Sequence, residues 1–554
     1  MSAVPGGGIS ARFPKAGHGA PRLARDPGLK AAAGGPARKA RPRFRGETPQ
    51  SRALPAVPWG ERRVHVGQCR ARRRWPACAQ VARACRGRPF SGPGAGEYPM
   101  SFVSIEFLLL FGIALAVLPF IRNIPLRNMC ILGFSCIFYA WWSVPHLFLM
   151  LSICFIAYIS ALWMRKGKFI LWLAISLIVL TLIYFKYYTF LLSTLGALGG
   201  GGGSTEKSII LPLGISFITF QMIAYVVDVY KQKVAAEKNP VDFFAFALFF
   251  PQLVAGPIER AASLLPQFKT LKTASREDAE LAVGLLVYAY FLKVFIADHA
   301  GLIADSVFGQ ATANGWSVIF GSMAFGLQIY ADFFAYSLMA IGFAKLLGFN
   351  LSLNFNRPYW STEPREFWSR WHITLSSWIR DYLYIPLGGN RHGTRRMALN
   401  LLLCMGLAGL WHGAGWNFVI WGLWWGAALV AWRLVVPPEF TRKPLGRALG
   451  WLVTLLVAFI GWFFFRVHSL EELSLAGNAL KHWEFFPANY WQLKALLFLG
   501  GILFVIEFFQ RRAQADLPLT GLHRYIKYAC LGVMLLCTLV FYNKNILSFI
   551  YFQF

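Results

Sequence analysis

A series of apolar blocks constrains what this chain can fold into. Crossing the hydrocarbon core of a bilayer as a helix takes about 20 apolar residues. Blocks approaching or exceeding this length run over residues 102–121, 127–142, 146–164, 168–185, 209–229, 279–297, 316–346, 397–411, 416–432, 449–465, 495–510 and 525–542. Lipid cannot satisfy backbone N–H and C=O groups, so such segments form helices or closed barrels. Because the blocks lack strand alternation, we predict an all-α, polytopic transmembrane protein.

The composition agrees with burial in lipid. Of the 554 residues, 56% are hydrophobic and only 14% are charged, whereas soluble domains carry about 25% charged residues. Three of the nine cysteines precede the first apolar block, and the other six lie mostly in apolar runs. None has the spacing of metal ligands. We therefore expect no disulfide, no metal site and no bound cofactor.

Residues 1–99 differ from the rest of the chain. They hold 20 of the 55 Lys and Arg residues but only 4 of the 25 Asp and Glu residues. Because they are rich in Gly, Pro, Ala and Arg, we predict that they form a disordered basic tail and that residues 100–554 form the membrane domain. The tail could bind nucleic acid or anionic lipid, or act as a transit peptide. We favour a translated leader with the true start at Met100, because an apolar helix follows directly, and we expect no nucleic-acid partner.

The basic residues predict the orientation of the helices. Loops at 122–127, 165–168 and 231–238 carry Lys and Arg and follow alternate crossings, so all three can face the cytoplasm. Met100 and the C-terminus then lie outside. Lys186 and Lys207 are exceptions, because they fall on the outer side.

One apolar segment cannot cross as a single helix. Residues 242–258 are interrupted by Pro251, Gly256 and Pro257, and basic residues follow. We expect this segment to enter and leave on one side as a re-entrant segment. Irregular backbone survives at membrane depth only against protein or a water-filled cavity, which is also what an enzyme inside a bilayer requires.

A stretch rich in aromatic residues and cations runs from residue 367 to 391. It contains Arg370, Trp371, His372, Arg380 and Asp381 and has no clean spanning run. Such a mixture is typical of a helix at the membrane interface or in a cavity. Ionisable residues at membrane depth are costly and therefore functional candidates. Taken alone, His372 fits an interface anchor best, although it could also serve as a second base or a substrate hydrogen-bond donor.

The second candidate is the sequence around Trp411 and His412, at the end of an apolar helix. Burial disfavours the imidazolium form and keeps His412 neutral, and a neutral imidazole is a competent general base for a hydroxyl. Gly409 and Gly413 would let a substrate approach the backbone closely. The alternative is a core histidine that is hydrogen-bonded at a helix end.

Several motifs together resemble one enzyme family. They are RWHITLS at 370–376, RDYLYIPLGGN at 380–390, LWHG at 410–413, LPLGISF at 211–217 and FPQLVAGPI at 250–258. They look like the signature of membrane-bound O-acyltransferases, especially the membrane subunit of bacterial alginate O-acetyltransferases and its D-alanyl-transferring relatives. The resemblance covers about residues 100–554.

The resemblance implies a fold, a site and a location. The fold would be a ring of helices with re-entrant segments around a central tunnel in the bacterial inner membrane. His412 corresponds to the catalytic histidine and His372 to the supporting one, and Arg370, Trp371, Arg380, Asp381 and Trp411 are candidates for the tunnel wall. Acetyl-CoA or another acyl thioester would enter from the cytoplasm. An extracytoplasmic acetyltransferase partner would complete transfer to an alginate-like polysaccharide.

The implied mechanism has His412 deprotonating an acceptor hydroxyl that attacks the thioester carbonyl, with His372 stabilising the oxyanion or orienting the donor. An aromatic wall would exclude water. The alternatives are D-alanyl or other acyl transfer to a cell-envelope polymer, a proton-coupled transporter, or a scaffold that recruits a partner enzyme.

The chain ends on a charge-free aromatic tail, residues 546–554. The tail could lie at the lipid interface, where aromatic residues are common. The sharper hypothesis is that it folds back into the outer mouth of the tunnel and presents Tyr551 to His412. The ending resembles the C-terminal motif of partner peptides in D-alanylation systems, where a tyrosine accepts the acyl group, and a phenol is a plausible acyl relay.

Overall fold

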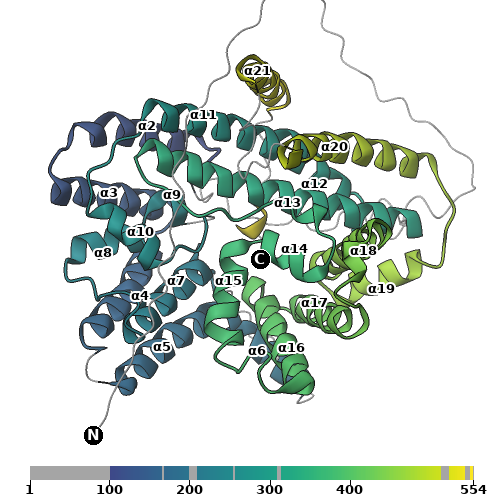
Figure 1. Ribbon diagram of the computed structural model, residues 1–554, viewed down its shortest axis with the longest axis horizontal. Coiled ribbons are helices and arrows are strands. Elements are labelled where there is room, and N and C mark those ends of the chain that lie inside the picture. Colours follow the sequence, from purple (N-terminus) through teal and green to yellow (C-terminus); the bar gives the residue numbers. More distant parts are fainter. Residues whose placement is uncertain are drawn as a thin grey trace, which may run out of the picture. The chain divides into compact units, whose positions relative to one another are not determined.

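The protein is helical throughout the part of the chain that the structure describes. The computed structural model describes residues 100–164, 167–198, 209–253, 256–308, 314–512, 523–542 and 549–552, and all regular secondary structure in these ranges is helix (Figure 1). The all-α prediction is therefore confirmed. The basic segment at 1–99 lies outside the described residues.

The helices fall into groups by length and apolarity. Eight are long and apolar enough to cross a membrane: α4 (Val144–Leu162), α5 to α6 (Lys168–Ala197), α11 to α12 (Arg276–Asp305), α13 (Gly315–Leu346), α17 (Trp416–Val435), α18 (Pro444–Arg466), α20 (Pro487–Arg512) and α21 (Arg524–Phe541). Shorter apolar helices are α2 with η1 (Ile105–Phe120), α3 (Ile124–Ala140), α7 (Ile215–Tyr230) and the pair α8 and α9 (Pro240–Leu253). The remaining α-helices are α10 (Ala261–Phe268), α14 (Pro364–Arg370), α15 (Ile373–Ile379), α16 (Gly393–His412) and α19 (Leu470–Ala479).

The twelve predicted blocks all coincide with helices, but they are not equivalent. Eight meet the length and apolarity of a crossing, and three are shorter helices of 10 to 17 residues. The block at 397–411 lies in α16, a helix of 20 residues that is not among the eight, because its first turns carry Arg395 and Arg396. Within the described residues, eight of the twelve blocks therefore have the length and apolarity of a membrane crossing.

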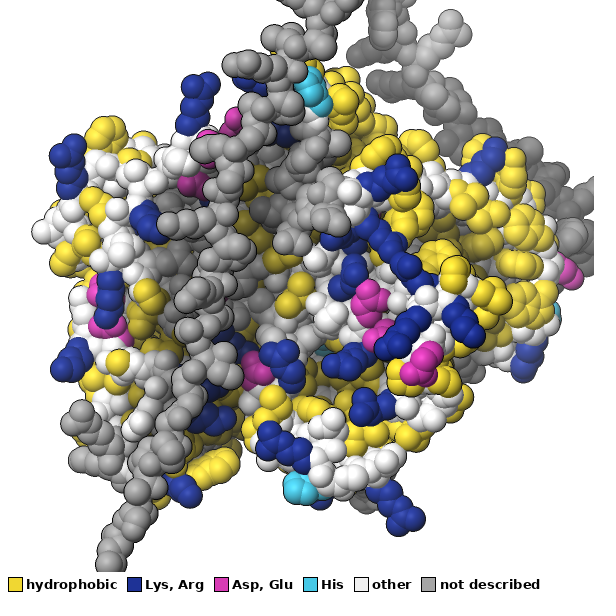
Figure 2. All heavy atoms as spheres, viewed as in Figure 1, with side chains coloured by type: hydrophobic (Ala, Val, Ile, Leu, Met, Phe, Trp, Pro, Cys, Tyr) yellow, Lys and Arg dark blue, Asp and Glu magenta, His cyan; other side chains and the backbone are white. Residues whose placement is uncertain are grey.

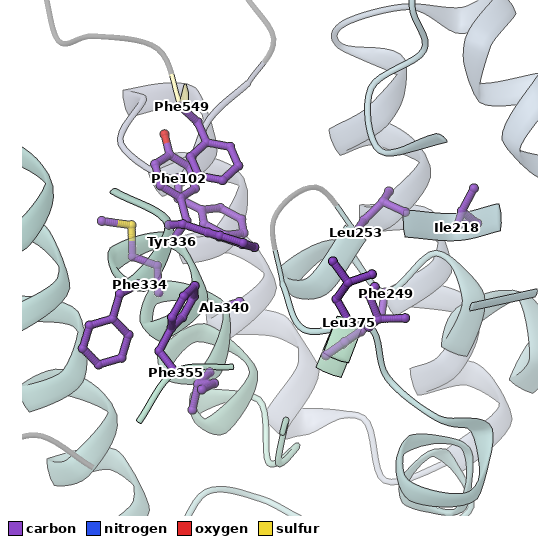
Figure 3. Close-up of a cluster of buried hydrophobic side chains, with 14 of the residues drawn as sticks. Phe102, Ile218, Phe249, Leu253, Phe334, Tyr336, Ala340, Phe355, Leu375 and Phe549 are labelled. Atoms are coloured by element: carbon purple, nitrogen blue, oxygen red, sulfur yellow. The ribbon is translucent and has the colours of Figure 1, made fainter. Parts of the chain in front are cut away.

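Helix α13 is the centre of the described fold and lies in the middle of Figure 1. Its 32 residues are capped by Asn314, whose side chain accepts from the Ser317 N–H at 2.9 Å. Of the most apolar 18-residue stretch of α13, 89% is buried inside the protein, against 11–56% for the other helices that could cross a membrane. Helix α13 therefore packs against protein instead of lipid. Figure 3 shows part of the surrounding core, in which Phe334, Tyr336 and Ala340 of α13 lie near Phe102 and Phe355.

The segment predicted to be re-entrant is broken into two short helices, α8 (Pro240–Ala247) and α9 (Phe250–Leu253). The Asn128 side chain donates 2.8 Å hydrogen bonds to Asp242 and to the Phe268 carbonyl, and Lys269 pairs with Glu237 at 2.6 Å. The chain therefore leaves this segment close to where it entered.

The LPLG and FPQL motifs meet in space. Gly214 has a φ of +72°, and a Cβ there would lie 2.9 Å from the Leu253 carbonyl oxygen. Gln252 donates to Gln221 of α7 at 3.0 Å. The left-handed glycine therefore lets the re-entrant segment pack directly against the start of α7.

Loops predicted to face the cytoplasm lie together. Arg127 donates to the Thr270 carbonyl at 3.4 Å, and Tyr158 at the end of α4 donates to the Lys238 carbonyl at 2.6 Å. Figure 2 shows Lys and Arg side chains gathered on the visible face, over the region that Figure 1 shows as α14 to α18. One face of the membrane domain is therefore strongly basic.

Helices α16 and α17 approach each other through glycines. A Cβ on Gly409 would lie 2.0 Å from the Phe418 carbonyl oxygen, and one on Gly422 would lie 2.1 Å from that of Met405. Small residues permit such close backbone contact between membrane helices. The expectation that Gly409 and Gly413 admit substrate is wrong, because the backbone and ring of Phe418 occupy the space beside them.

This contact predicts the effect of one methyl group. Gly409→Ala should destabilise the protein by about 1–3 kcal/mol, the usual cost of overpacking, and lower its melting temperature in detergent. Gly406→Ala is the matched control, because its Cβ would meet only the Leu423 side chain at an ordinary 3.5 Å. Equal melting temperatures for the two variants would contradict the glycine contact.

Candidate active site

His412 ends helix α16 inside the protein. Its side chain is 3% exposed, and neither ring nitrogen has a hydrogen-bond partner among the described residues. The ring packs against Trp411, Trp421 and Phe465 with centroid distances of 5.0, 4.9 and 5.3 Å. Buried polar groups are normally hydrogen-bonded, so among the described residues His412 is not the hydrogen-bonded core histidine of the alternative interpretation.

A buried lysine holds the end of α16 in place. Lys186 donates to the carbonyl oxygens of Trp411 and His412 at 2.6 and 2.9 Å, and to the Ser216 hydroxyl at 3.3 Å. Tyr187 donates to the Leu410 carbonyl at 2.7 Å. These carbonyls have no partner within the helix, and a cation at a helix C-terminus is favourable. Lys186 therefore fixes the turn that carries His412.

His372 stands at the start of α15 in a strained conformation. Its φ of +40° is rare for a residue with a side chain, and such strain is common at functional sites. Its Nδ1 lies 3.0 Å from the Asn354 amide oxygen, which also accepts from the Thr374 hydroxyl at 2.9 Å. Because that oxygen only accepts, Nδ1 carries the proton, and Nε2 of the neutral ring is an acceptor.

Five rings form a closed circle in the interior. Trp411 contacts both His372 and His412, with centroid distances of 5.8 and 5.0 Å. On the other side, Phe333 contacts His372 at 4.7 Å and Tyr551 at 4.5 Å. Tyr551 closes the circle, with its ring 5.6 Å from His412. Of the C-terminal tail, the described residues 549–552 lie beside α13, visible as the short yellow segment next to α13 in Figure 1, and place Tyr551 against His412 as the relay hypothesis requires.

A cavity of about 810 Å³ lies between α14, α15, α16 and α17. Arg365, Arg380 and Arg433 line it together with Trp368. Trp368 lies between the cavity and the histidine pocket, because it lines the cavity and its ring packs 5.8 Å from Trp421, which contacts His412. The cavity can accept a ligand with an anionic portion at its cationic wall.

The other candidate residues have different surroundings. Trp371 is 1% exposed and packs against Trp462 at 4.8 Å. Arg370 pairs with Glu366 at 2.7 Å, and Asp381 pairs with Arg380 at 2.8 Å. Trp371, Arg370 and Asp381 are not among the residues that line the cavity. Of the five tunnel candidates, Arg380 lines the cavity and Trp411 lies between the two histidines.

The described residues contain no group of three or more His, Cys, Asp or Glu that could hold a metal ion. The titratable groups that the rings of this site supply are two imidazoles and one phenol. Two site residues were missed by sequence reasoning. Lys186 was recorded only as an exception to the charge rule, although a lone lysine in an apolar segment is itself a functional signal. Asn354 gave no signal, because its contact with His372 is tertiary.

The fold and the site define a multi-pass membrane protein with a buried histidine pair. Residues 134–471 match the family model described as MBOAT, membrane-bound O-acyltransferase family. The chain belongs to the membrane-bound O-acyltransferase family and is an O-acyltransferase.

Named relatives span several activities. The chain is 37% identical to "Probable alginate O-acetylase AlgI" of Azotobacter vinelandii, over 76% of this chain and 87% of that protein. It is also 37% identical to "Peptidoglycan O-acetyltransferase" of Helicobacter pylori, over 61% of this chain and 70% of that protein. It is 27% identical to "Teichoic acid D-alanyltransferase" of Streptococcus thermophilus, over 48% of this chain and 64% of that protein.

The contacts of Lys186 predict a specific loss. Lys186→Met keeps the length of the side chain but leaves buried carbonyls unsatisfied, at a cost of about 1–3 kcal/mol. We expect a lower melting temperature and, because His412 loses its support, acyl transfer slower by about 10-fold or more. Lys238→Met is the control, since that side chain is exposed. Wild-type rates in Lys186→Met would show that the cap is dispensable.

Proposed function

We propose that this enzyme moves acetyl groups from a cytoplasmic thioester to hydroxyl groups of an extracytoplasmic polysaccharide. The observation that carries the proposal is the contact between His412 and Tyr551 in the interior, 5.6 Å between ring centroids. One is a base and the other a hydroxyl, and the tyrosine belongs to the chain terminus. A base and an acceptor so placed suit acyl transfer through the protein.

The proposed donor is acetyl-CoA or another acyl thioester, such as an acyl carrier. Such donors carry phosphate, for which arginine is well suited, and Arg365, Arg380 and Arg433 supply a cationic wall. The charge rule supports placing the basic face in the cytoplasm. The thioester would then reach toward His412 past Trp368 and Trp421.

His412 is the proposed general base. It takes the proton of the attacking hydroxyl, whose oxygen bonds to the thioester carbonyl carbon, and the thiolate leaves and is then protonated. The surrounding tryptophans exclude water that would hydrolyse the thioester. For His372 the acceptor Nε2 favours an orienting role, because an acceptor nitrogen cannot donate to an oxyanion.

Tyr551 is the proposed acyl relay. Its phenol oxygen attacks the thioester, so that an ester forms on Tyr551 and the thiol is released. An acceptor hydroxyl then attacks this ester and restores the phenol. The two-step route is supported by the position of Tyr551 between His412 and Phe333. It lets donor and acceptor approach the tyrosine from opposite sides.

The acceptor is proposed from the relatives. Alginate and peptidoglycan are the polymers in the names of two proteins at 37% identity. We therefore infer O-acetylation of an alginate-like or related envelope polysaccharide in a bacterial inner membrane, completed by an extracytoplasmic acetyltransferase partner. Transfer of a D-alanyl group is the second candidate, supported by the 27% identical D-alanyltransferase.

The histidine roles predict graded losses. His412→Ala should lower polymer acetylation by about 100-fold or more, the usual contribution of a general base, with membrane insertion intact. His372→Ala should reduce acetylation strongly. His523→Ala, at an exposed site, is the control. The rates are measured as acetate released from purified polymer, and normal acetylation in His412→Ala would refute the mechanism.

The relay predicts a covalent intermediate. Mass spectrometry of wild-type protein incubated with acetyl donor should find an acetyl group on the peptide that contains Tyr551. Tyr551→Phe removes the hydroxyl and keeps the apolar bulk, so it should abolish both this modification and polymer acetylation. Tyr542→Phe, whose side chain is 55% exposed, should leave both unchanged. Unchanged acetylation in Tyr551→Phe would mean that the tail is only an anchor.

A further inference from the structure

A buried ion cluster lies beneath the C-terminal tail. Lys293 Nζ is 2.9 Å from Asp298 and 3.0 Å from Asp332, and the side chains of Lys293 and Asp332 are 1% and 2% exposed. Lys293 lies in the π-helical segment η4 (Leu292–Ala297), which joins α11 to α12. One ammonium faces two carboxylates, so at full ionisation the cluster carries one uncompensated negative charge.

The tail supplies a donor to this charge. The backbone N–H of Ile550 donates to Asp332 Oδ2 at 2.8 Å, while Oδ1 of the same carboxylate faces Lys293. Ile550 is 1% exposed, so the bond is shielded from water. Hydrogen bonds to an ionised acceptor are about twice as strong as neutral ones, and an unpaired buried N–H would be costly.

Aromatic packing accompanies this bond. Phe549 is fully buried and stacks on Tyr336 at 4.2 Å between ring centroids. Figure 3 shows Phe549 beside Phe102 and above Tyr336. Apolar contacts hold the tail in the interior, but they are not directional. A slip of the tail by one residue would keep most of the apolar burial and would move the Tyr551 ring away from His412.

The hydrogen bond from the Ile550 N–H to Asp332 is directional, so it can fix the register of the tail. Asp332 directly precedes Phe333, whose ring contacts both His372 and Tyr551. We propose that Lys293, Asp298 and Asp332 form a tail latch that recognises the Ile550 backbone N–H and thereby sets Tyr551 against His412. The latch rests on the proposed relay for its functional meaning, and its residues are positioning residues because they reach the chemistry only through the tail.

Recognition through a backbone N–H predicts which changes the latch tolerates. Ile550→Leu keeps the N–H and an apolar side chain, so it should dock normally. Ile550→Pro removes the donor, and proline fits sterically at the first position of a helical turn, which Ile550 occupies in η8 (Ile550–Phe552). In Asp332→Asn, Lys293 claims the amide oxygen, so the amide NH₂ group faces the Ile550 N–H and the bond is lost.

Docking of the tail can be measured without activity. Chymotrypsin cleaves after Tyr551 only when the ring leaves its pocket, and intact-mass spectrometry of the purified full-length protein detects the loss of residues 552–554. We expect cleavage about 10-fold or more faster in Ile550→Pro and Asp332→Asn than in wild type and Ile550→Leu, consistent with losing one charge-assisted hydrogen bond. Equal cleavage rates in all four proteins would overturn the latch.

Polymer acetylation in the same variants separates the latch from the relay. If both hold, acetylation falls by about 10-fold or more in Ile550→Pro and stays at the wild-type level in Ile550→Leu. Faster cleavage of Ile550→Pro with unchanged acetylation would establish the latch and refute the relay. Loss of acetylation in Ile550→Pro without faster cleavage would refute the latch while leaving the relay to the Tyr551→Phe measurement.

Discussion

The structure depends on satisfying polar groups where no water is available to do so. In lipid, an unpaired N–H or C=O group costs several kcal/mol, and an unpaired charge costs far more. Each buried charged side chain therefore needs a polar partner within the protein. Lys186 is paired with the last carbonyls of α16, and Lys293 is paired with two aspartates. Both partnerships lie at the site, where they hold His412 and the tail that carries Tyr551.

Within the described ranges, three π-helical segments carry cations around the site. They are η3 (Ile183–Tyr187), η4 (Leu292–Ala297) and η6 (Arg380–Tyr384), which carry Lys186, Lys293 and Arg380. A π-turn widens the helix locally, turns a side chain off the regular face and recurs at functional sites. Lys186 binds the carbonyl end of the helix that carries His412, Lys293 pairs with Asp332 beside Ile550, and Arg380 lines the cavity.

The strained backbone of His372 and the close contact between α16 and α17 both limit the movement of the two histidines. His372 has a φ of +40° and its ring is hydrogen-bonded to Asn354, and α16 lies directly against α17 through glycines. Both arrangements reduce the freedom of the histidines. General-base catalysis by a histidine requires such fixed geometry, because misplacement by about 1 Å can cost 100-fold in rate.

The sequence by itself determined the helical class, the positions of the apolar helices and the two histidine motifs, because hydropathy is a local property and those motifs are contiguous. It also suggested that the Tyr551 tail returns to His412, through a resemblance. It misjudged the glycines beside His412, whose neighbouring space Phe418 fills. Only the tertiary structure brought Asn354 to His372, Lys186 to α16 and Asp332 to Ile550. These partners are 18, more than 200 and 218 residues apart, and a hydrogen bond between distant residues leaves no periodic mark on the sequence.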